Sequence, residues 1–212
     1  MIRFVRSDTV AILILNWNGW HDTRACLASL QGVPARLVMV DNGSTDGSVR
    51  RAMEEFPAVE IVENGENLGF ADGNNRGISH ALATGAEYVM LLNNDTVVEP
   101  GFLDPLIRVL EKQPGLGFVS PSIYYAEPPE RPWFLVGTVD WRRGVPYLLQ
   151  DFPRLDTEPF TTPIATGCCV MAKRETWKHV GLLDSRYFLY WEDCDWTLRV
   201  TRAGGIGQRA QN

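Results

Sequence analysis

Val10-Ala11-Ile12-Leu13-Ile14-Leu15 is an uninterrupted apolar run, and Asn16-Trp17-Asn18-Gly19 follows it directly. A short apolar run with β-branched members is typical of a strand buried on both faces of a sheet. A polar sequence with a glycine is typical of the loop that follows such a strand. An apolar strand followed by a polar loop recurs further along the chain, so this stretch predicts the fold of the first half.

Strand and helix signals alternate over the first 120 residues. Besides 10–15, strands are predicted at 37–40, 59–62, 88–92 and 117–120. Amphipathic helices are predicted between them at 20–30, 47–56, 71–83 and 101–112. Strands that alternate with helices predict βαβ units, so we expect an α/β fold with a Rossmann-like, mostly parallel sheet flanked by helices.

The remainder of the chain is less regular. Residues 124–162 hold many prolines and aromatic residues, which predicts an ordered, irregular segment with one hairpin near 142–144. A strand is predicted at 165–171, then a short helix through Trp177 and a last helix that begins near Glu192. The tail at 204–212 has little apolar content and is expected to be frayed.

Composition limits the classes of protein. The 212 residues suit one domain, and 45% hydrophobic with 22% charged residues is ordinary for a globular chain. A net charge of −6 argues against a nucleic-acid binder. The sequence has neither an apolar run long enough for a transmembrane helix nor the flanks of a signal peptide, so a cytoplasmic location is expected.

Polar residues follow four of the predicted strands where each strand ends. These segments are Asn16-Trp17-Asn18-Gly19, Asp41-Asn42-Gly43-Ser44-Thr45-Asp46, Asn64-Gly65-Glu66-Asn67-Leu68-Gly69 and Asn93-Asn94-Asp95. In an open α/β sheet, ligands bind outside the carboxyl ends of the strands. The sequence therefore predicts a binding site along this edge.

The segment after residue 40 has two interpretations. Asp41, Gly43 and Ser44 can form a turn, and Ser44 or Asp46 can cap the next helix. Alternatively, the Asp41 carboxylate points into the edge and accepts hydrogen bonds from a base or a ribose hydroxyl. The residues alone leave both open.

Asn93-Asn94-Asp95 also has two interpretations. The carboxylate can cap the next segment, or it can hold Mg²⁺ or Mn²⁺ together with the phosphates of a ligand. The second would explain how an acidic protein binds an anion.

A third acidic segment is Tyr190-Trp191-Glu192-Asp193-Cys194-Asp195-Trp196. Its acids can complement a helix dipole, with Asp195 paired to Arg199 at i,i+4. Alternatively, one carboxylate is a general base in a cleft walled by Tyr190 and Trp191.

The order of these segments resembles the inverting nucleotide-sugar glycosyltransferases of family 2, which have the GT-A fold, and in particular their bacterial rhamnosyltransferase-like branch. The resemblance extends from residue 9 to about 205. It is carried by Asn16-Trp17-Asn18-Gly19, Asp41-Asn42-Gly43-Ser44-Thr45-Asp46-Gly47-Ser48, Asn67-Leu68-Gly69-Phe70-Ala71, Asn74-Asn75-Arg76-Gly77, Leu91-Leu92-Asn93-Asn94-Asp95, Thr166-Gly167 and Glu192-Asp193-Cys194-Asp195.

The resemblance implies one GT-A domain over 1–212, with a nucleotide-binding half at 1–120 and a smaller acceptor-binding and catalytic half at 121–212. It implies that Asp193 is the catalytic base and that Asp95 binds a divalent metal, Mg²⁺ or Mn²⁺. The implied donor-binding residues are Asn16, Asn18, Asp41, Gly43, Ser44, Asn67, Gly69, Asn74 and Asn94. The implied acceptor-side residues are Thr166, Gly167, Tyr190, Trp191 and Glu192.

The implied reaction, in polysaccharide biosynthesis, moves a sugar from dTDP-rhamnose or a UDP-sugar to a hydroxyl of a glycan or lipid-linked acceptor, with inversion. A lipid-linked acceptor would bring the protein to the inner face of the membrane. Many relatives have a metal-binding histidine after the base, but the histidines here are His21, His80 and His179. Either the chain is a shortened version of the family, or its site is completed differently. A non-catalytic sugar-nucleotide binding module therefore stays open. A nucleotidyltransferase is disfavoured because the loop at 16–20 has no basic residue.

Overall fold

The computed structural model describes residues 9–140, 142–143, 145–149, 160–204 and 206–209. Within them, a sheet of eight strands has the order β10-β12-β5-β11-β4-β1-β2-β3. Its strands are β1 (Val10–Asn16), β2 (Arg36–Asp41), β3 (Glu60–Glu63), β4 (Tyr88–Asn93), β5 (Leu116–Ser120), β10 (Phe160–Thr161), β11 (Cys169–Lys173) and β12 (Ile206–Arg209). The helices are α1 (Trp20–Ser29), α2 (Ser48–Glu55), α3 (Gly69–Ala83), α4 (Leu103–Lys112), α5 (Arg174–Val180) and α6 (Glu192–Arg202).

The first four strands form the parallel part of the sheet. β1 pairs with β2 and β4, and β2 pairs with β3, all in parallel. In this register Asn16 lies opposite Asp41, and Leu15 lies opposite Asn93. The carboxyl ends of β1, β2 and β4 are therefore level, so that the loops after them meet along one edge. β11 runs antiparallel to β4 and β5, which leaves the sheet mostly parallel as expected.

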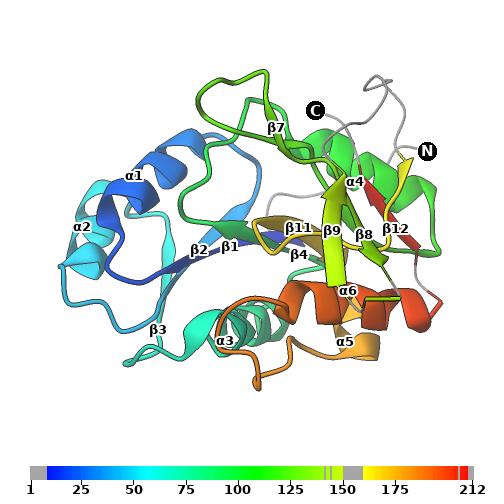
Figure 1. Ribbon diagram of the computed structural model, residues 1–212. Helices are drawn as coiled ribbons and strands as arrows, with labels where there is room; N and C mark the ends of the chain where they lie inside the picture. The colour runs from blue at the N-terminus through cyan, green and yellow to red at the C-terminus, as the bar shows by residue number, and fades with distance from the viewer. Residues whose placement is uncertain (1–8, 141, 144, 150–159, 205, 210–212) are drawn as a thin grey trace.

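Helices cover both faces of the sheet. One buried cluster joins α1, α2 and α4 to the sheet through residues such as Leu27, Ala52 and Leu106. The other joins α3, α5 and α6 through Ile78 and two stacked tryptophans, Trp177 and Trp196, whose ring centroids are 4.0 Å apart. Figure 1 shows α3, α5 and α6 together below the sheet. The α/β architecture predicted from the alternating pattern is confirmed.

The expected frayed tail is wrong for residues 206–209. These residues form β12, which pairs in parallel with β5 and antiparallel with β10. Thr162 donates its N–H to the carbonyl of Gly207 at 3.0 Å, and a Cβ on Gly207 would lie 2.1 Å from the Phe118 ring. A strand that pairs through its backbone and packs through a glycine has no apolar pattern to detect.

Two smaller hairpins account for much of the irregular segment. β6 (Ile123–Tyr124) pairs with β7 (Pro132–Phe134), and β8 (Val136–Asp140) pairs with β9 (Val145–Leu149). The second pair confirms the hairpin predicted near 142–144. Residues 150–159 of the predicted segment lie outside the described residues. In the part that the structure describes, no helix is long and apolar enough to cross a membrane.

β11 begins later than the strand predicted at 165–171. Residues 167 and 168 form a turn instead, and the strand starts at Cys169. The physical reason is that the N–H of Gly167 bonds to a side chain of α6 rather than to a neighbouring strand. This side chain belongs to the candidate site.

Candidate functional site

Asn16, at the end of β1, joins two loops of the carboxyl edge. Its Nδ2 donates to Asp41 Oδ1 at 3.1 Å and to Ser44 Oγ at 2.9 Å. Its Oδ1 accepts from the N–H of Gly19 at 3.2 Å and from Thr23 Oγ1 at 2.8 Å. Asn16 is fully buried, and both donors and both acceptor positions of its amide are engaged. In this conformation it holds the edge together and offers no group to a ligand.

Asp41 is engaged in the same way. Its Oδ2 accepts from the N–H groups of Gly43 and Ser44, at 3.1 and 2.9 Å, and the residue is 3% exposed. Gly43 has φ +79°, and a Cβ there would lie 2.6 Å from the backbone of Glu66. The turn interpretation of this segment is therefore confirmed, whereas contact between Asp41 and a nucleotide stays a prediction.

Asn18 holds the β1–α1 loop against the β2–α2 loop from the outside. Its Oδ1 accepts from the N–H groups of Thr45 and Asp46, at 2.7 and 3.2 Å, and its own N–H donates to Ser44 Oγ at 2.9 Å. Asp46 in turn accepts from the N–H of Ser48, the first residue of α2. The N-cap of α2 is Gly47, without a side-chain cap bond, so neither Ser44 nor Asp46 takes the predicted cap position; Asp46 bonds to Ser48 from the position before Gly47.

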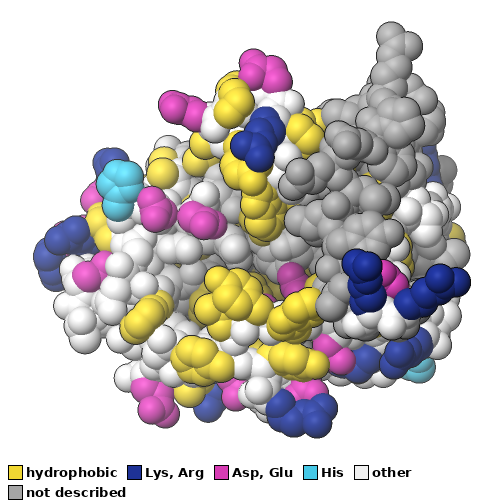
Figure 2. Space-filling model, viewed as in Figure 1, with side chains coloured by type: hydrophobic (Ala, Val, Ile, Leu, Met, Phe, Trp, Pro, Cys, Tyr) yellow, Lys and Arg dark blue, Asp and Glu magenta, His cyan; other side chains and the backbone are white. Residues whose placement is uncertain are grey.

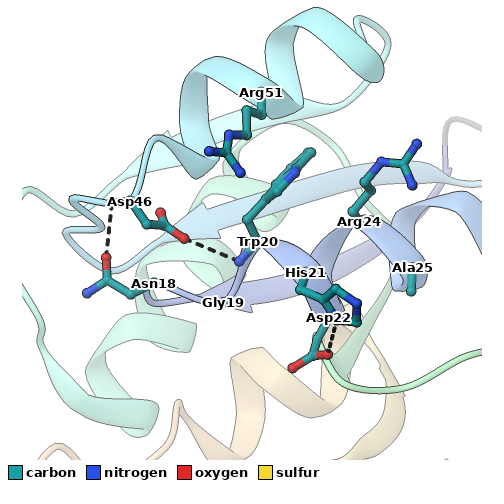
Figure 3. Close-up of a pocket in the computed structure, with 9 residues that line it drawn as sticks. All are labelled: Asn18, Gly19, Trp20, His21, Asp22, Arg24, Ala25, Asp46 and Arg51. Carbon is teal, nitrogen blue, oxygen red and sulfur yellow. Dashed lines mark hydrogen bonds and ion pairs between the residues drawn. The ribbon is translucent and has the colours of Figure 1, made fainter.

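A cavity of about 580 Å³ lies between the first turns of α1 and α2 (Figure 3). Its lining residues are Asn18, Gly19, Trp20, His21, Asp22, Arg24, Ala25, Asp46 and Arg51. Of the predicted donor-binding residues, only Asn18 belongs to this lining. The cavity thus borders the carboxyl edge on the α1 side and is not the place where the predicted residues converge.

Asn42, which was not among the predicted residues, organises the β3–α3 loop. Its Nδ2 donates to Asn67 Oδ1 at 2.8 Å and to the carbonyl of Gly69 at 3.0 Å. Its Oδ1 accepts from Asn64 Nδ2 at 3.0 Å and from the N–H of Leu68 at 3.2 Å. The only signal in the sequence was its place directly after Asp41, in a polar strand end.

The start of α3 lies against the segment that precedes α6. Gly69 has φ +78°, and a Cβ on it would lie 2.4 Å from the carbonyl oxygen of Phe188. The N–H of Phe70 donates to that same oxygen at 2.7 Å. Asn74 is 2% exposed and donates to the carbonyl of Phe70 at 2.9 Å, so it braces the first turns of α3.

The two predicted acidic positions differ in their partners. Asp95, just after β4, is exposed and has no hydrogen-bond or ion-pair partner among the residues that the structure describes. Its neighbour Asn94 donates to Thr23 Oγ1 at 2.9 Å. Asp193, in the first turn of α6, accepts from the N–H of Gly167 at 2.8 Å and from that of Cys194 at 2.7 Å.

Cys168 lies close to both of these acids. Burial raises the pKa of its thiol to about 11; a hydrogen bond with Thr96 opposes this rise, and the negative charges of Asp95 and Asp193 add to it. Burial likewise raises the pKa of Cys26 to about 12, with Asp95 contributing. Cys168 lies just before β11 and beside the end of β4, where its carbonyl accepts from the N–H of Asn93 at 2.9 Å and its Sγ lies 3.4 Å from Thr96 Oγ1. Because Gly167 bonds to Asp193, the segment after β4 and the start of α6 meet at residues 167–168.

Glu192 is buried beside Asp193. It is 4% exposed, and its Oε2 has no hydrogen-bond partner in the described structure. Burial raises its pKa to about 7, and the charge of Asp193 contributes to the rise. A carboxyl in this position takes up a proton near neutral pH, unlike an ordinary glutamate.

Tyr190 and Trp191 do not enclose Asp193 as a cleft wall in this conformation. They are 71% and 47% exposed, and both have a positive φ, +70° and +78°. With Phe188 and Leu189, which are also exposed, they form a cluster of hydrophobic side chains over the α5–α6 loop (Figure 2). Thr166, also predicted on the acceptor side, accepts from the N–H of Cys168 at 3.2 Å.

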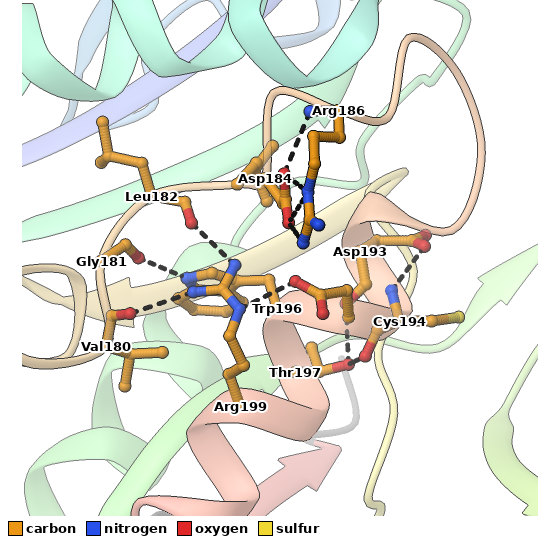
Figure 4. A network of polar contacts seen from close by, with 12 residues as sticks. Val180, Gly181, Leu182, Asp184, Arg186, Asp193, Cys194, Trp196, Thr197 and Arg199 are labelled. Carbon is orange, nitrogen blue, oxygen red and sulfur yellow. Dashed lines mark hydrogen bonds and ion pairs between the residues drawn. The ribbon is translucent and has the colours of Figure 1, made fainter.

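Arg199 anchors the loop between α5 and α6. It forms the predicted ion pair with Asp195, with Nε 2.8 Å from Oδ2. The guanidinium also donates to the carbonyls of Val180 and Leu182, at 3.0 and 2.7 Å (Figure 4). The i,i+4 spacing indicated the ion pair but gave no sign of the two carbonyls.

The site could bind a divalent cation through one carboxylate, that of Asp95. No cluster of three or more His, Cys, Asp or Glu side chains suited to a metal occurs in the described parts of the chain. Asp95 nevertheless presents a carboxylate that has no hydrogen-bond or ion-pair partner within the described residues. Mg²⁺ is commonly held by one or two carboxylates together with ligand phosphates, so a single free carboxylate is sufficient.

Comparison with known proteins shows which family this chain is similar to. A family model described as "Glycosyl transferase family 2" matches residues 11–181. The chain is 28% identical to an N-acetylglucosaminyl-diphospho-decaprenol L-rhamnosyltransferase of Mycobacterium tuberculosis, over 94% of this chain and 73% of that protein.

Solved structures show the same fold. GalNAc-T7, solved with UDP, GalNAc and Mn²⁺, matches 95% of this chain with a TM-score of 0.78 and 18% identity. A mannosyltransferase of Pyrobaculum calidifontis, solved with GDP-Man and Mn²⁺, matches 96% with a TM-score of 0.67 and 19% identity. The chain spans 42% and 54% of these two proteins. At this identity the likeness shows the fold, which is the GT-A arrangement expected from the sequence.

Proposed function

Because the chain belongs to glycosyl transferase family 2, we propose that it transfers a sugar from a nucleotide diphosphate sugar to an acceptor hydroxyl with inversion. The observation that carries this proposal is that Asp193, a carboxylate oriented by two N–H groups, lies at the turn that also meets the segment of Asp95. Thr96, the residue after Asp95, lies 3.4 Å from Cys168 Sγ, and Asp95 has no hydrogen-bond or ion-pair partner among the described residues.

The donor binds along the carboxyl edge in this proposal. Ser44, Asn18 and the loop at 67–69 face the nucleotide, while Asn16 and Asp41 hold these loops from beneath. Asp95 would hold a divalent cation together with the diphosphate. The cation would neutralise the negative charge that develops on the departing diphosphate.

Asp193 is the general base in this proposal. Its carboxylate takes the proton of the acceptor hydroxyl, whose oxygen attacks the anomeric carbon from the face opposite the nucleotide. The bond between that carbon and the diphosphate oxygen breaks, and the nucleotide diphosphate departs with the electron pair. Because there is one displacement and no covalent intermediate, the anomeric configuration inverts. The N–H groups of Gly167 and Cys194 fix the orientation of the carboxylate.

We propose dTDP-rhamnose as the first donor to test, with UDP-sugars second, because the resemblance is to the rhamnosyltransferase branch. The relative at 28% identity is named for a diphospho-decaprenol acceptor. A lipid-linked diphosphosugar is therefore the acceptor class to test first, with transfer at the inner face of the membrane.

The test is transfer of sugar from each donor to a polyprenyl-diphosphate N-acetylglucosamine acceptor, read by mass spectrometry. The variant is Asp193→Asn, and the control is Asp104→Asn, an exposed acid in the first turn of α4. General-base catalysis contributes about 10²–10⁴-fold, so Asp193→Asn should lose that much rate while its affinity for the donor stays the same. The anomeric configuration of the product, read by NMR, tests inversion.

Three results would contradict the proposal. If Asp193→Asn transferred sugar at the rate of the unmodified chain, Asp193 would not be the general base. A product with retained configuration would exclude the single displacement. An unmodified chain that binds nucleotides but transfers no sugar from any donor would support a non-catalytic binding module instead.

A further inference from the structure

The segment from 181 to 191, between α5 and α6, is tied down at its start by Arg199. The guanidinium holds the carbonyls of Val180, the last residue of α5, and of Leu182 (Figure 4). Further along, Asp184 forms an ion pair with Arg186, whose side chain is exposed. The segment then reaches the exposed aromatic side chains and Asp193.

Asn75, on α3, ties the same segment down at a second place. Its Nδ2 donates to the carbonyl of Leu183 at 2.9 Å, and its Oδ1 accepts from the N–H of Leu183 at 3.0 Å. One side-chain amide thus satisfies both backbone polar groups of a single residue, 108 positions away in the sequence. This pairing has the geometry of a backbone ladder, and it fixes both the position and the orientation of the segment.

A third tie lies closer to the donor side. The N–H of Phe70 donates to the carbonyl of Phe188 at 2.7 Å, and Gly69 approaches this carbonyl so closely that no side chain fits. Gly69 is itself held by Asn67 and Asn42 of the donor-side loops. The β3–α3 loop and the α5–α6 segment therefore form one continuous hydrogen-bonded unit.

We propose that Asn75 is a positioning residue that couples the donor-side loop at 67–70 to the acceptor-side residues Tyr190, Trp191 and Asp193. This inference rests on the function proposed above. In this inference Asn75 acts by holding Leu183 and not by binding nucleotide or acceptor itself.

The backbone at Tyr190 and Trp191 explains why such a tie is needed. Non-glycine residues with a positive φ are strained and persist only where their surroundings constrain them. Their side chains are largely exposed, so packing supplies little of that constraint. The tie at Phe188 fixes the chain just before the strained pair, and the N–H of Asp195 holds the carbonyl of Trp191 at 2.9 Å. The tie at Leu183 fixes the earlier part of the same segment.

The first test compares Asn75→Ala with Ser79→Ala, an exposed position one turn further along α3. Small misplacements of catalytic groups cost up to about 10²-fold in rate. We expect Asn75→Ala to lower kcat about 10-fold and to raise the KM for the acceptor. The affinity for nucleotide should be unchanged, and a larger share of the donor should be hydrolysed instead of transferred. Equal losses in acceptor and nucleotide affinity, or an unchanged kcat, would overturn the inference.

A second variant guards against a folding failure. Asn75→Asp keeps the acceptor for the Leu183 N–H but sets a carboxylate oxygen against the Leu183 carbonyl and near Asp72. At neutral pH its loss should equal or exceed that of Asn75→Ala, and it should shrink toward low pH, where the protonated carboxyl can donate. A double-mutant cycle with Trp191→Ala then tests the route of the effect. If Asn75 acts through the placement of Trp191, the two effects on acceptor KM are less than additive. Full additivity would overturn the coupling.

Hydrogen exchange without any ligand separates this inference from the proposed function. The amides of 183–191 should exchange faster in Asn75→Ala than in Ser79→Ala, because local opening becomes easier. Unchanged exchange would overturn the role of Asn75 whatever the protein catalyses. A chain that binds no nucleotide but shows the faster exchange would overturn the proposed function and the coupling to a donor, and leave Asn75 as a structural tie alone.

Discussion

The backbone N–H of Gly167 donates to Asp193 Oδ2 at 2.8 Å, across 26 positions of the sequence. A Cβ on Gly167 would lie 3.0 Å from the ring of Phe70 and 3.5 Å from the Cβ of Asp193. The turn before β11, the start of α3 and the first turn of α6 thus meet at one point. The absence of a side chain at Gly167 leaves room for the Phe70 ring beside this turn, whereas Asp193 lies at ordinary contact distance.

Gly167→Ala should therefore impair the proposed reaction without weakening the binding of the nucleotide. The added methyl group must displace the Phe70 ring, and the Asp193 carboxylate loses its orientation. We expect kcat to fall about 10-fold or more, with nucleotide affinity within about twofold, in steady-state assays and titration calorimetry.

Two further variants make this prediction specific. Gly115→Ala is the control, because a Cβ there meets nothing within 4 Å. Phe70→Leu, added to Gly167→Ala, makes room for the methyl group and should restore part of the rate. A Gly167→Ala protein with normal kcat would contradict the positioning of Asp193 by this turn.

Asn16→Ala should destabilise the fold. The substitution removes four hydrogen bonds at a fully buried position and leaves the Asp41 carboxylate and the Thr23 hydroxyl short of partners. A buried polar group without a partner costs about 1–3 kcal/mol, so we expect a loss of about 2–3 kcal/mol in the free energy of unfolding. Urea denaturation measures it, with the exposed Gln31→Ala as control. A change below about 0.5 kcal/mol, ordinary for a surface site, would refute the bridging role.

Glu192 should make stability depend on pH. Its pKa rises from an ordinary value of 4.5 to about 7 in the folded chain. As pH rises between these values, the unfolded chain releases the proton while the folded chain retains it, so the folded state loses stability. Glu192→Gln has no proton to release. Its free energy of unfolding, relative to that of the unmodified chain, should therefore increase from pH 4.5 to 7 and stay constant at higher pH.

The size of this effect follows from the shift. One pKa unit corresponds to about 1.4 kcal/mol, so the difference in unfolding free energy between Glu192→Gln and the unmodified chain should reach the order of 1–3 kcal/mol. Unfolding free energies at several pH values measure it, with the exposed Glu175→Gln, in the first turn of α5, as control. A difference between Glu192→Gln and the unmodified chain that does not change with pH would show that this carboxyl titrates normally.

The sequence was sufficient to predict those strands and loops that follow a repeated local pattern of apolar and polar residues. The buried run at 10–15 and the strands after it fall where the apolar residues indicated, and the polar strand ends do lie along one edge. β12 could not be predicted, because Gly207 contributes through the space that it leaves beside Phe118.

The ties within the site were also beyond the sequence. Asn42, Asn75 and Arg199 act on backbone groups of distant segments, and a polar residue gives no local sign of which carbonyl it will meet. Likewise, the outward direction of Tyr190 and Trp191 depends on a positive φ that aromatic residues rarely adopt.

The most direct test of the central claim is the thermal unfolding of the chain with nucleoside diphosphates, with and without Mn²⁺. A ligand that binds only the folded state at 100 times its Kd stabilises by about 2.7 kcal/mol, and about 2–4 °C accompanies each kcal/mol in a domain of this size. We predict that dTDP or UDP with Mn²⁺ raises Tm by several degrees, and that Asp95→Asn loses the part of the rise that requires Mn²⁺. A Tm indifferent to every nucleoside diphosphate would contradict the account.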